Sequence, residues 1–303
     1  MSKGWRSDVG RLGASVGLAV LLGLGSTPQL AGVLAQPRPQ TAEAWLDQGL
    51  QQVQQGDINA AIAAFQQAIQ LDPQFSPAHY NLGLAERQRG NLQAAADAFH
   101  RALQTDPSFA LAYANLGAAL LEGNNLPLAA QYLQRAIELD PEMGLAYYNL
   151  GLVQRQQGNL PDAISAFQRA LQLSPNAPEP AYYLGLIYLQ QQQSERALTA
   201  FQRAVAITPS HAEAHYSIGS ILYTQGDMEG ALAAFRRSTQ AKPDYANAYY
   251  GAGLAFLQQG QATEAERVLV YARDLFVAQG NRQWATSAEQ LLQQLPTQPA
   301  QPR

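Results

Sequence analysis

The sequence predicts an all-α solenoid in which short helix pairs stack in chain order, because three kinds of residue recur at one fixed interval. Glycine, alanine and proline each return every 34 residues. A period of this length is typical of stacked helical repeats, each too small to bury an apolar core alone. The recurring glycines are Gly49, Gly83, Gly117, Gly151, Gly185, Gly219 and Gly253. We number the places within each 34-residue unit from 1 to 34.

The N-terminal residues 1–35 have the three-part pattern of an export signal. Basic residues precede an apolar stretch from Leu12 to Gly25, and Val33 and Ala35 fit the last positions before a cleavage site. The apolar stretch is 14 residues long, shorter than the roughly 20 that a membrane-spanning helix needs. We therefore expect a cleaved signal and an exported protein in a periplasm, a thylakoid lumen or the medium. A retained anchor that tethers the chain to a membrane is the alternative.

The remaining chain divides into four segments. Residues 36–41 form a short linker with proline, and residues 42–279 hold seven units of 34 residues. Residues 280–295 are predicted to form a helix that caps the last unit. The Pro- and Gln-rich tail, 296–303, is expected to be disordered.

Each unit is predicted to contain two helices, as the second unit shows. Gly90 separates two stretches whose apolar residues recur every three or four positions. Pro107 ends the second stretch because proline cannot donate a backbone hydrogen bond and disfavours helix before it. Small residues at places 8 and 20 are expected to let the two helices approach, with a bulky residue at place 24 beside them. A small residue at place 27 is expected to let the next unit dock.

These recurring residues resemble the tetratricopeptide repeat (TPR) family. In the second unit they are Gly83, Ala95, Phe99, Ala102 and Pro107. The resemblance implies antiparallel helix pairs stacked into a right-handed superhelix, with a concave face lined by first helices that holds a peptide. The sequence departs from the family pattern at two turn glycines and at the last proline, which are replaced by Asn124, Gln192 and Val277.

Composition argues against several classes of function. The formal net charge is −4, lysine is rare and there is no cysteine. Nucleic-acid binding is therefore not expected, and neither are disulfides or thiolate metal sites. No phosphate-binding loop, nucleophile elbow or metalloprotease motif is present. We predict a protein that is not an enzyme and takes no cofactor, no metal and no small-molecule substrate.

By the resemblance, places 2, 5, 6, 9, 12 and 13 of each first helix face the concave side. Asparagine occupies place 6 in three successive units, and its amide can pair with both the N–H and the C=O of a peptide. Frequent use of asparagine at this place for other reasons is the alternative. Tyrosine at place 5 and arginine at place 12 complete the predicted peptide-binding set. The set is Asn81, Asn115, Asn149, Tyr80, Tyr148, Tyr182, Tyr216, Tyr250, Arg87 and Arg155.

The sequence does not support a metal site or a clamp for chaperone C-termini. His211 and His215 are four residues apart, but no third metal ligand is evident, and His79 and His215 are expected to pack between helices. The family's clamp for chaperone C-termini needs Lys or Arg at places 2, 5 and 6 of particular units, and no unit has one at any of these places.

The function predicted from the sequence is a scaffold or assembly factor that binds extended segments of partner proteins in its concave groove. The alternative is an accessory subunit that brings substrates to an enzyme acting in trans, such as a glycosyltransferase or a cell-envelope enzyme.

Overall fold

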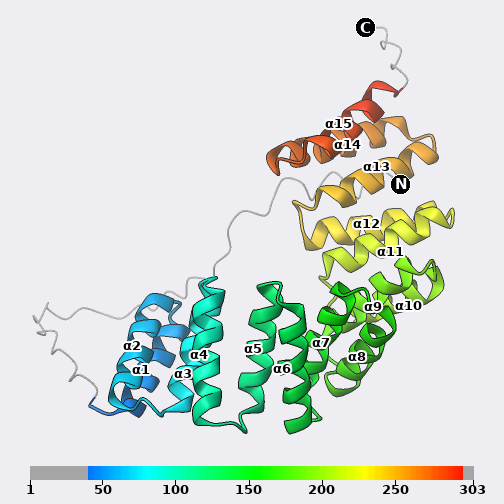
Figure 1. Cartoon of the computed structure of the whole chain (residues 1–303). Helices are drawn as coiled ribbons and strands as arrows, with labels where there is room; N and C mark the ends of the chain where they lie inside the picture. Colours follow the sequence, from blue (N-terminus) through cyan, green and yellow to red (C-terminus); the bar gives the residue numbers. More distant parts are fainter. Residues whose placement is uncertain (1–39, 296–303) are drawn as a thin grey trace, which may run out of the picture. The chain divides into compact units, whose positions relative to one another are not determined.

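The computed structural model describes residues 40–295, and within this range the predicted all-α fold is confirmed, with helices and no strand. The predicted export signal, most of the linker and the C-terminal tail lie outside the described residues. Residues 41–295 hold fifteen helices that follow one another in chain order (Figure 1). None of the helices in this range is long and apolar enough to cross a membrane.

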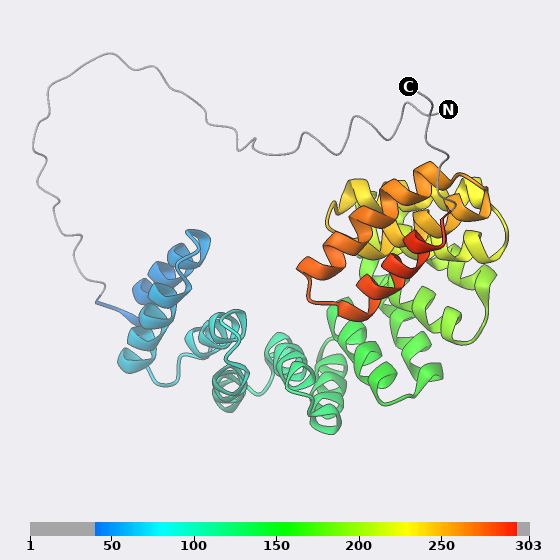
Figure 2. The same ribbon diagram turned by 90° about the horizontal axis from the view of Figure 1, so that it is seen from above.

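Each of the seven units forms one pair of helices joined by a short turn, as two views of the ribbon show (Figures 1 and 2). The first helices are α1 (Ala42–Gln54), α3 (Ser76–Gln88), α5 (Ala110–Glu122), α7 (Gly144–Gln156), α9 (Pro178–Gln190), α11 (Ala212–Thr224) and α13 (Ala246–Gln258). The second helices are α2 (Ile58–Leu71), α4 (Leu92–Thr105), α6 (Leu126–Leu139), α8 (Leu160–Leu173), α10 (Ser194–Ile207), α12 (Met228–Ala241) and α14 (Ala262–Ala278).

The packing predicted within each unit is confirmed by the space around the place-8 glycines. A Cβ atom added to Gly151 would lie only 2.7 Å from the Phe167 ring at place 24 of the same unit. Phe167 is fully buried. Glycine at place 8 therefore lets the aromatic ring of the second helix lie directly against the backbone of the first helix.

The small residue at place 27 forms part of the seam between units, as predicted. Ala68 is fully buried in a cluster with Ala78, which belongs to the first helix of the following unit. Ala136 and Ala146 repeat this contact two units later. Without larger side chains at this place, the second helix of one unit packs closely against the first helix of the next.

The turn between the two helices of a unit requires a positive φ at place 15. Gly90 adopts φ +81° there, whereas Asn124 and Gln192 adopt +59°. The turn is therefore retained in both units that lack the glycine, although a side chain beyond Cα disfavours this conformation.

The last unit ends differently because Val277 replaces the proline. Helix α14 has 17 residues, whereas the preceding second helices have 14. The additional helix α15 (Arg282–Gln293) packs against α14, and Trp284 stacks on Phe276 with ring centres 6.0 Å apart. Trp284 also meets Tyr250 edge-on at 5.3 Å.

Candidate functional site

The candidate site is the face formed by the first helices. Neighbouring first helices contact each other directly at α1–α3, α3–α5, α5–α7 and α11–α13. Within residues 41–295, no two second helices approach as closely as these pairs do. The first helices therefore line the inner side of the stack. We call the residues at places 2, 5, 6, 9, 12 and 13 of these helices the first-helix face.

The three place-6 asparagines have different surroundings. The Asn81 amide donates to the Pro77 carbonyl at 2.8 Å. Asn115 is only 6% exposed and donates to the Leu111 carbonyl at 2.9 Å and to the Tyr80 hydroxyl at 3.1 Å. Its oxygen accepts from Arg87 at 3.4 Å, so its amide is already engaged within the protein.

Asn149 differs from Asn81 and Asn115 because its side chain makes no hydrogen bond within the described residues. It is also 6% exposed, yet no hydrogen bond to another described residue occupies its oxygen or its N–H groups. A side-chain amide offers one acceptor and two donors. Because it is held in place by its surroundings, this amide can pair with a peptide backbone at little cost in side-chain entropy.

The place-5 tyrosines pack mainly against the protein itself. Tyr80 lies 4.7 Å from Phe109 between ring centres, and Tyr182 lies 5.6 Å from Phe201. Tyr148 and Tyr216 likewise pack against the place-24 phenylalanines of their own units, and Tyr250 packs against Trp284. All five are half-buried. Each ring therefore packs against other aromatic rings of the protein with part of its surface, and this packing stabilises the repeat.

Burial favours the protonated hydroxyls of Tyr148 and Tyr182 by raising their pKa values. Burial raises the pKa of Tyr148, with smaller increases from Tyr183 and Glu179, whereas Arg155 lowers it. Burial also raises the pKa of Tyr182 to about 12. A neutral hydroxyl can donate as well as accept a hydrogen bond. The hydroxyl of Tyr148 already interacts with Tyr183, and that of Tyr80 accepts from Asn115.

The two place-12 arginines differ in their partners. Arg87 forms an ion pair with Glu122 at 2.6 Å. The Arg155 guanidinium lies over the Tyr183 ring, 5.0 Å from its centre, and no described carboxylate forms an ion pair with it. Tyr183 is a face residue that the sequence-based set omitted. Its position at place 6, directly after the three asparagines, is the signal that marks it.

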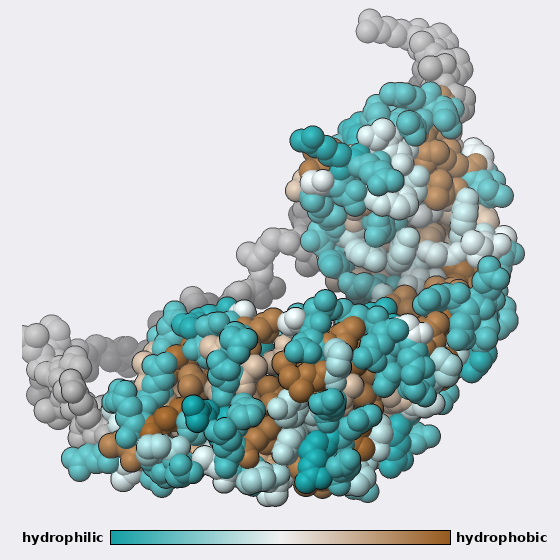
Figure 3. All heavy atoms as spheres, in the orientation of Figure 1, coloured by the Kyte–Doolittle hydropathy of each residue, from teal (hydrophilic) through white to brown (hydrophobic). Residues whose placement is uncertain are grey.

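The set also omitted exposed apolar side chains on this face. Leu111 and Leu145 occupy place 2 and are 38% and 45% exposed, and Leu50 and Val53 lie at places 9 and 12 with similar exposure. Figure 3 shows apolar surface between polar side chains along the row of repeats. These four residues could have been identified from the sequence, because they are apolar residues at places that the family resemblance assigns to the concave side.

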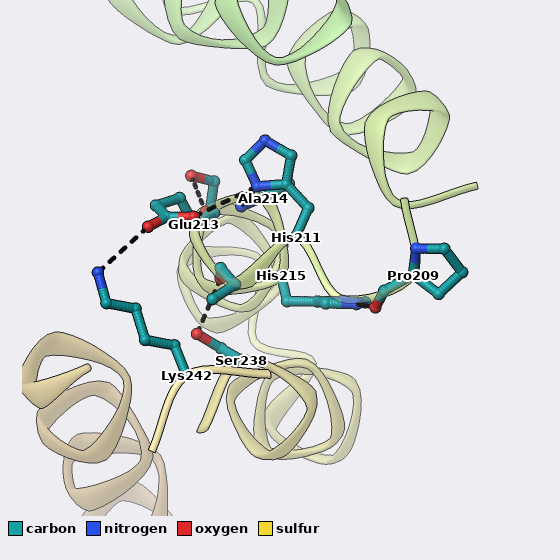
Figure 4. Close-up of polar contacts among 9 residues, drawn as sticks. Pro209, His211, Glu213, Ala214, His215, Ser238 and Lys242 are labelled. Carbon is teal, nitrogen blue, oxygen red and sulfur yellow. Dashed lines mark hydrogen bonds and ion pairs between the residues drawn. The ribbon is translucent and has the colours of Figure 1, made fainter. Parts of the chain in front are cut away.

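The histidines of the sixth unit have structural partners. His215 lies beside the Pro209 carbonyl at 2.9 Å through Nε2, and Nδ1 of His211 accepts from the Ala214 N–H at 3.4 Å. The two rings point in different directions (Figure 4). No group of three possible metal ligands occurs among the described residues.

Glu213 lies between the Lys242 ammonium and a ring nitrogen of His211 on this part of the face. Its carboxylate is 3.6 Å from the Lys242 ammonium and 3.4 Å from His211 Nδ1 (Figure 4). Ser238, at place 27, donates to the Ala212 carbonyl at 2.8 Å and ties the two helices of the unit together. The charges here are therefore partly satisfied within the protein.

Models of one known protein family match most of the chain. Tetratricopeptide repeat profiles match residues 28–74, 46–108, 80–144, 114–178, 182–246 and 222–273. The chain belongs to the tetratricopeptide repeat family. TPR repeats generally mediate protein–protein interactions. No curated protein matches the sequence.

Solved structures of TPR proteins share the fold. YrrB, described as a TPR protein with an unusual peptide-binding site, is 29% identical, with a TM-score of 0.52, over 64% of this chain and 99% of its own. A chain of the APC/C Cut9–Hcn1 hetero-tetramer is 24% identical, with a TM-score of 0.63, over 72% of this chain. This TPR protein spans 43% of that chain's length. A TPR protein from Parabacteroides merdae has a TM-score of 0.61 at 18% identity, over 83% of this chain and all of its own.

Proposed function

We propose that this TPR protein is a non-enzymatic scaffold or assembly factor that binds extended segments of partner proteins along the first-helix face. The observation that carries this proposal is the exposure of Leu50, Val53, Leu111 and Leu145 on that face. Large apolar side chains are stabilised by leaving water, and clusters of exposed ones mark interaction surfaces. The peptide-binding site named for YrrB supports the same use of the fold.

Asn149 supports an extended ligand. Its free amide can pair with a backbone N–H and C=O, as a neighbouring β-strand would. Leu145 lies one helical turn earlier on the same helix and offers an apolar contact for a ligand side chain. Together they would hold the backbone while tolerating varied sequence, which suits a scaffold with several client segments.

We also propose that the protein acts after export. The basic residues, the apolar stretch and the small residues before position 36 support this proposal, and they lie outside the described residues. An envelope or extracellular location would place its partners among exported proteins.

Site-specific photocrosslinking tests the proposed binding face. A photoreactive residue at Leu145 is compared with one at Gln168, which is exposed on the second helix of the same unit. After incubation with an envelope extract of the source cells, crosslinked segments are identified by mass spectrometry and made as synthetic peptides. We expect crosslinks from position 145 and few from 168, with the peptides binding wild type several-fold tighter than Asn149→Ala. Equal crosslinking from both positions would contradict the proposal.

A further inference from the structure

Two groups of four face residues occur two units apart and differ in their charge. Each group takes places 5 and 12 from one unit and places 6 and 13 from the next. The first group is Tyr80, Arg87, Asn115 and Glu122, and the second is Tyr148, Arg155, Tyr183 and Gln190. The comparison between them indicates what the second group binds, given the proposed role of this face in peptide binding.

In the first group, a carboxylate completes the set of contacts. Glu122 accepts from Arg87 at 2.6 Å and at 3.0 Å, through two nitrogens of one guanidinium. Arg87 also donates to Asn115 at 3.4 Å, and Asn115 donates to the Tyr80 hydroxyl at 3.1 Å. The first group is therefore a closed network in which every polar member has a partner inside the protein.

In the second group, the carboxylate is missing and the arginine remains. Gln190 stands where Glu122 stands, and it is exposed and uncharged. Arg155 is exposed and its guanidinium lies over the Tyr183 ring, and none of the described residues forms an ion pair with it. A guanidinium held over a ring still has N–H donors at its edge, and these can meet a carboxylate.

We infer that Arg155 accepts the carboxylate of an Asp or Glu side chain in a bound peptide, which takes the place that Glu122 has in the first group. Tyr183 orients the guanidinium and also engages the hydroxyl of Tyr148. The rings of these two tyrosines lie 6.0 Å apart. Glu179 acts on Tyr148 with a negative charge, opposite to that of Arg155, and therefore disfavours a second acidic side chain beside the first.

A peptide selection tests this inference. The probe is a library of 12-residue peptides with either Glu or Gln at the centre and uncharged residues elsewhere. We expect wild type to retain the Glu peptides about two- to five-fold better than the Gln peptides, which is the range for an exposed ion pair. The preference should weaken as salt is added, because exposed charges are screened.

Four single variants distinguish the contribution of the second group from that of the rest of the first-helix face. Arg155→Gln should remove the preference, and Gln190→Glu should remove it by supplying an internal partner for Arg155. Arg169→Gln should leave it unchanged, because Arg169 is exposed on the second helix of the same unit and lies outside the first-helix face. Glu122→Gln should free Arg87 and increase retention of peptides with two Glu residues.

The outcomes distinguish this inference from the proposed function. Retention of Glu and Gln peptides to the same extent would overturn the acidic subsite while leaving peptide binding intact. A preference that survives in Arg155→Gln would also overturn it. If wild type retained no peptide of either kind, both the subsite and the proposed peptide-binding face would be refuted.

Discussion

At the scale of single residues, a few close contacts account for which residue type each place requires. His215 is an example, because its ring is buried and lies against the Pro209 carbonyl at 2.9 Å. A carbonyl can only accept, so Nε2 donates and the neutral ring is sufficient for this bond. Burial lowers the pKa of His215, which means that the folded protein disfavours the charged ring.

The lowered pKa of His215 makes stability depend on pH. The unfolded chain binds the proton first, near pH 6.5, so the stability that the neutral ring contributes is complete above that pH and falls as the pH drops through the folded pKa. We expect His215→Gln to lower the urea midpoint at pH 8 and to do so less at pH 5. Urea unfolding of both proteins at the two pH values measures this. A difference between them that does not change with pH would contradict the prediction.

Gly151 tests the packing inside a unit. An added Cβ would lie 2.7 Å from the buried Phe167 ring, so even Gly151→Ala should cost about 1–3 kcal/mol through overpacking. Gly123→Ala is the matched control, because no atom would lie closer than 3.4 Å to its Cβ and its φ is negative. Chemical denaturation of the two variants measures the costs, and an equal loss in both would refute the packing account.

At the scale of elements, the turn between the two helices of a unit depends on one backbone conformation. Gln192 and Asn124 both adopt φ +59°, which disfavours most side chains but is better tolerated by asparagine. We expect Gln192→Gly to stabilise the protein by about 0.5–1 kcal/mol. Asn124→Gly should gain less, and it should also lose the hydrogen bond from Gln156 at 3.0 Å. Thermal unfolding compares them, and a destabilised Gln192→Gly variant would show that the turn is not strained.

At the scale of the whole repeat array, stability is expected to pass from neighbour to neighbour. Each unit contacts mainly the units beside it, so losing an end should weaken the nearest helices most. Helix α15 covers Phe276, which is only 2% exposed, and Trp284 packs against both Phe276 and Tyr250.

Deletion of residues 281–303 tests this behaviour. We expect faster amide hydrogen exchange in α13 and α14, with little change in α1 to α4, because the lost contacts lie at the other end of the array. Hydrogen exchange with mass spectrometry reads each helix separately. The variant Trp284→Ala should have a smaller effect of the same kind. Uniform acceleration along the chain would indicate one cooperative unit instead.

The sequence by itself determined the repeat period, the fold class and the residue type at the packing places. The residue types of Gly83, Phe99 and Ala102 recur because the same contact between helices is made in every unit. The 34-residue period is therefore enough to predict that contact. Val277, in place of a proline, likewise indicated that the last unit ends differently, and α14 is longer there.

Only the tertiary structure decided which polar face residues are available to a ligand. Asn115 and Asn149 are identical by place, yet the first is engaged by Tyr80 and Arg87 and the second is free. Arg87 and Arg155 also occupy the same place, but only Arg87 has an ion-pair partner among the described residues. That partner is Glu122, which lies 35 residues away in the sequence. Such differences depend on which side chains of the next unit come within about 3 Å of a hydrogen-bonding atom. The packing of neighbouring units determines these distances. The repeat pattern in the sequence does not contain them.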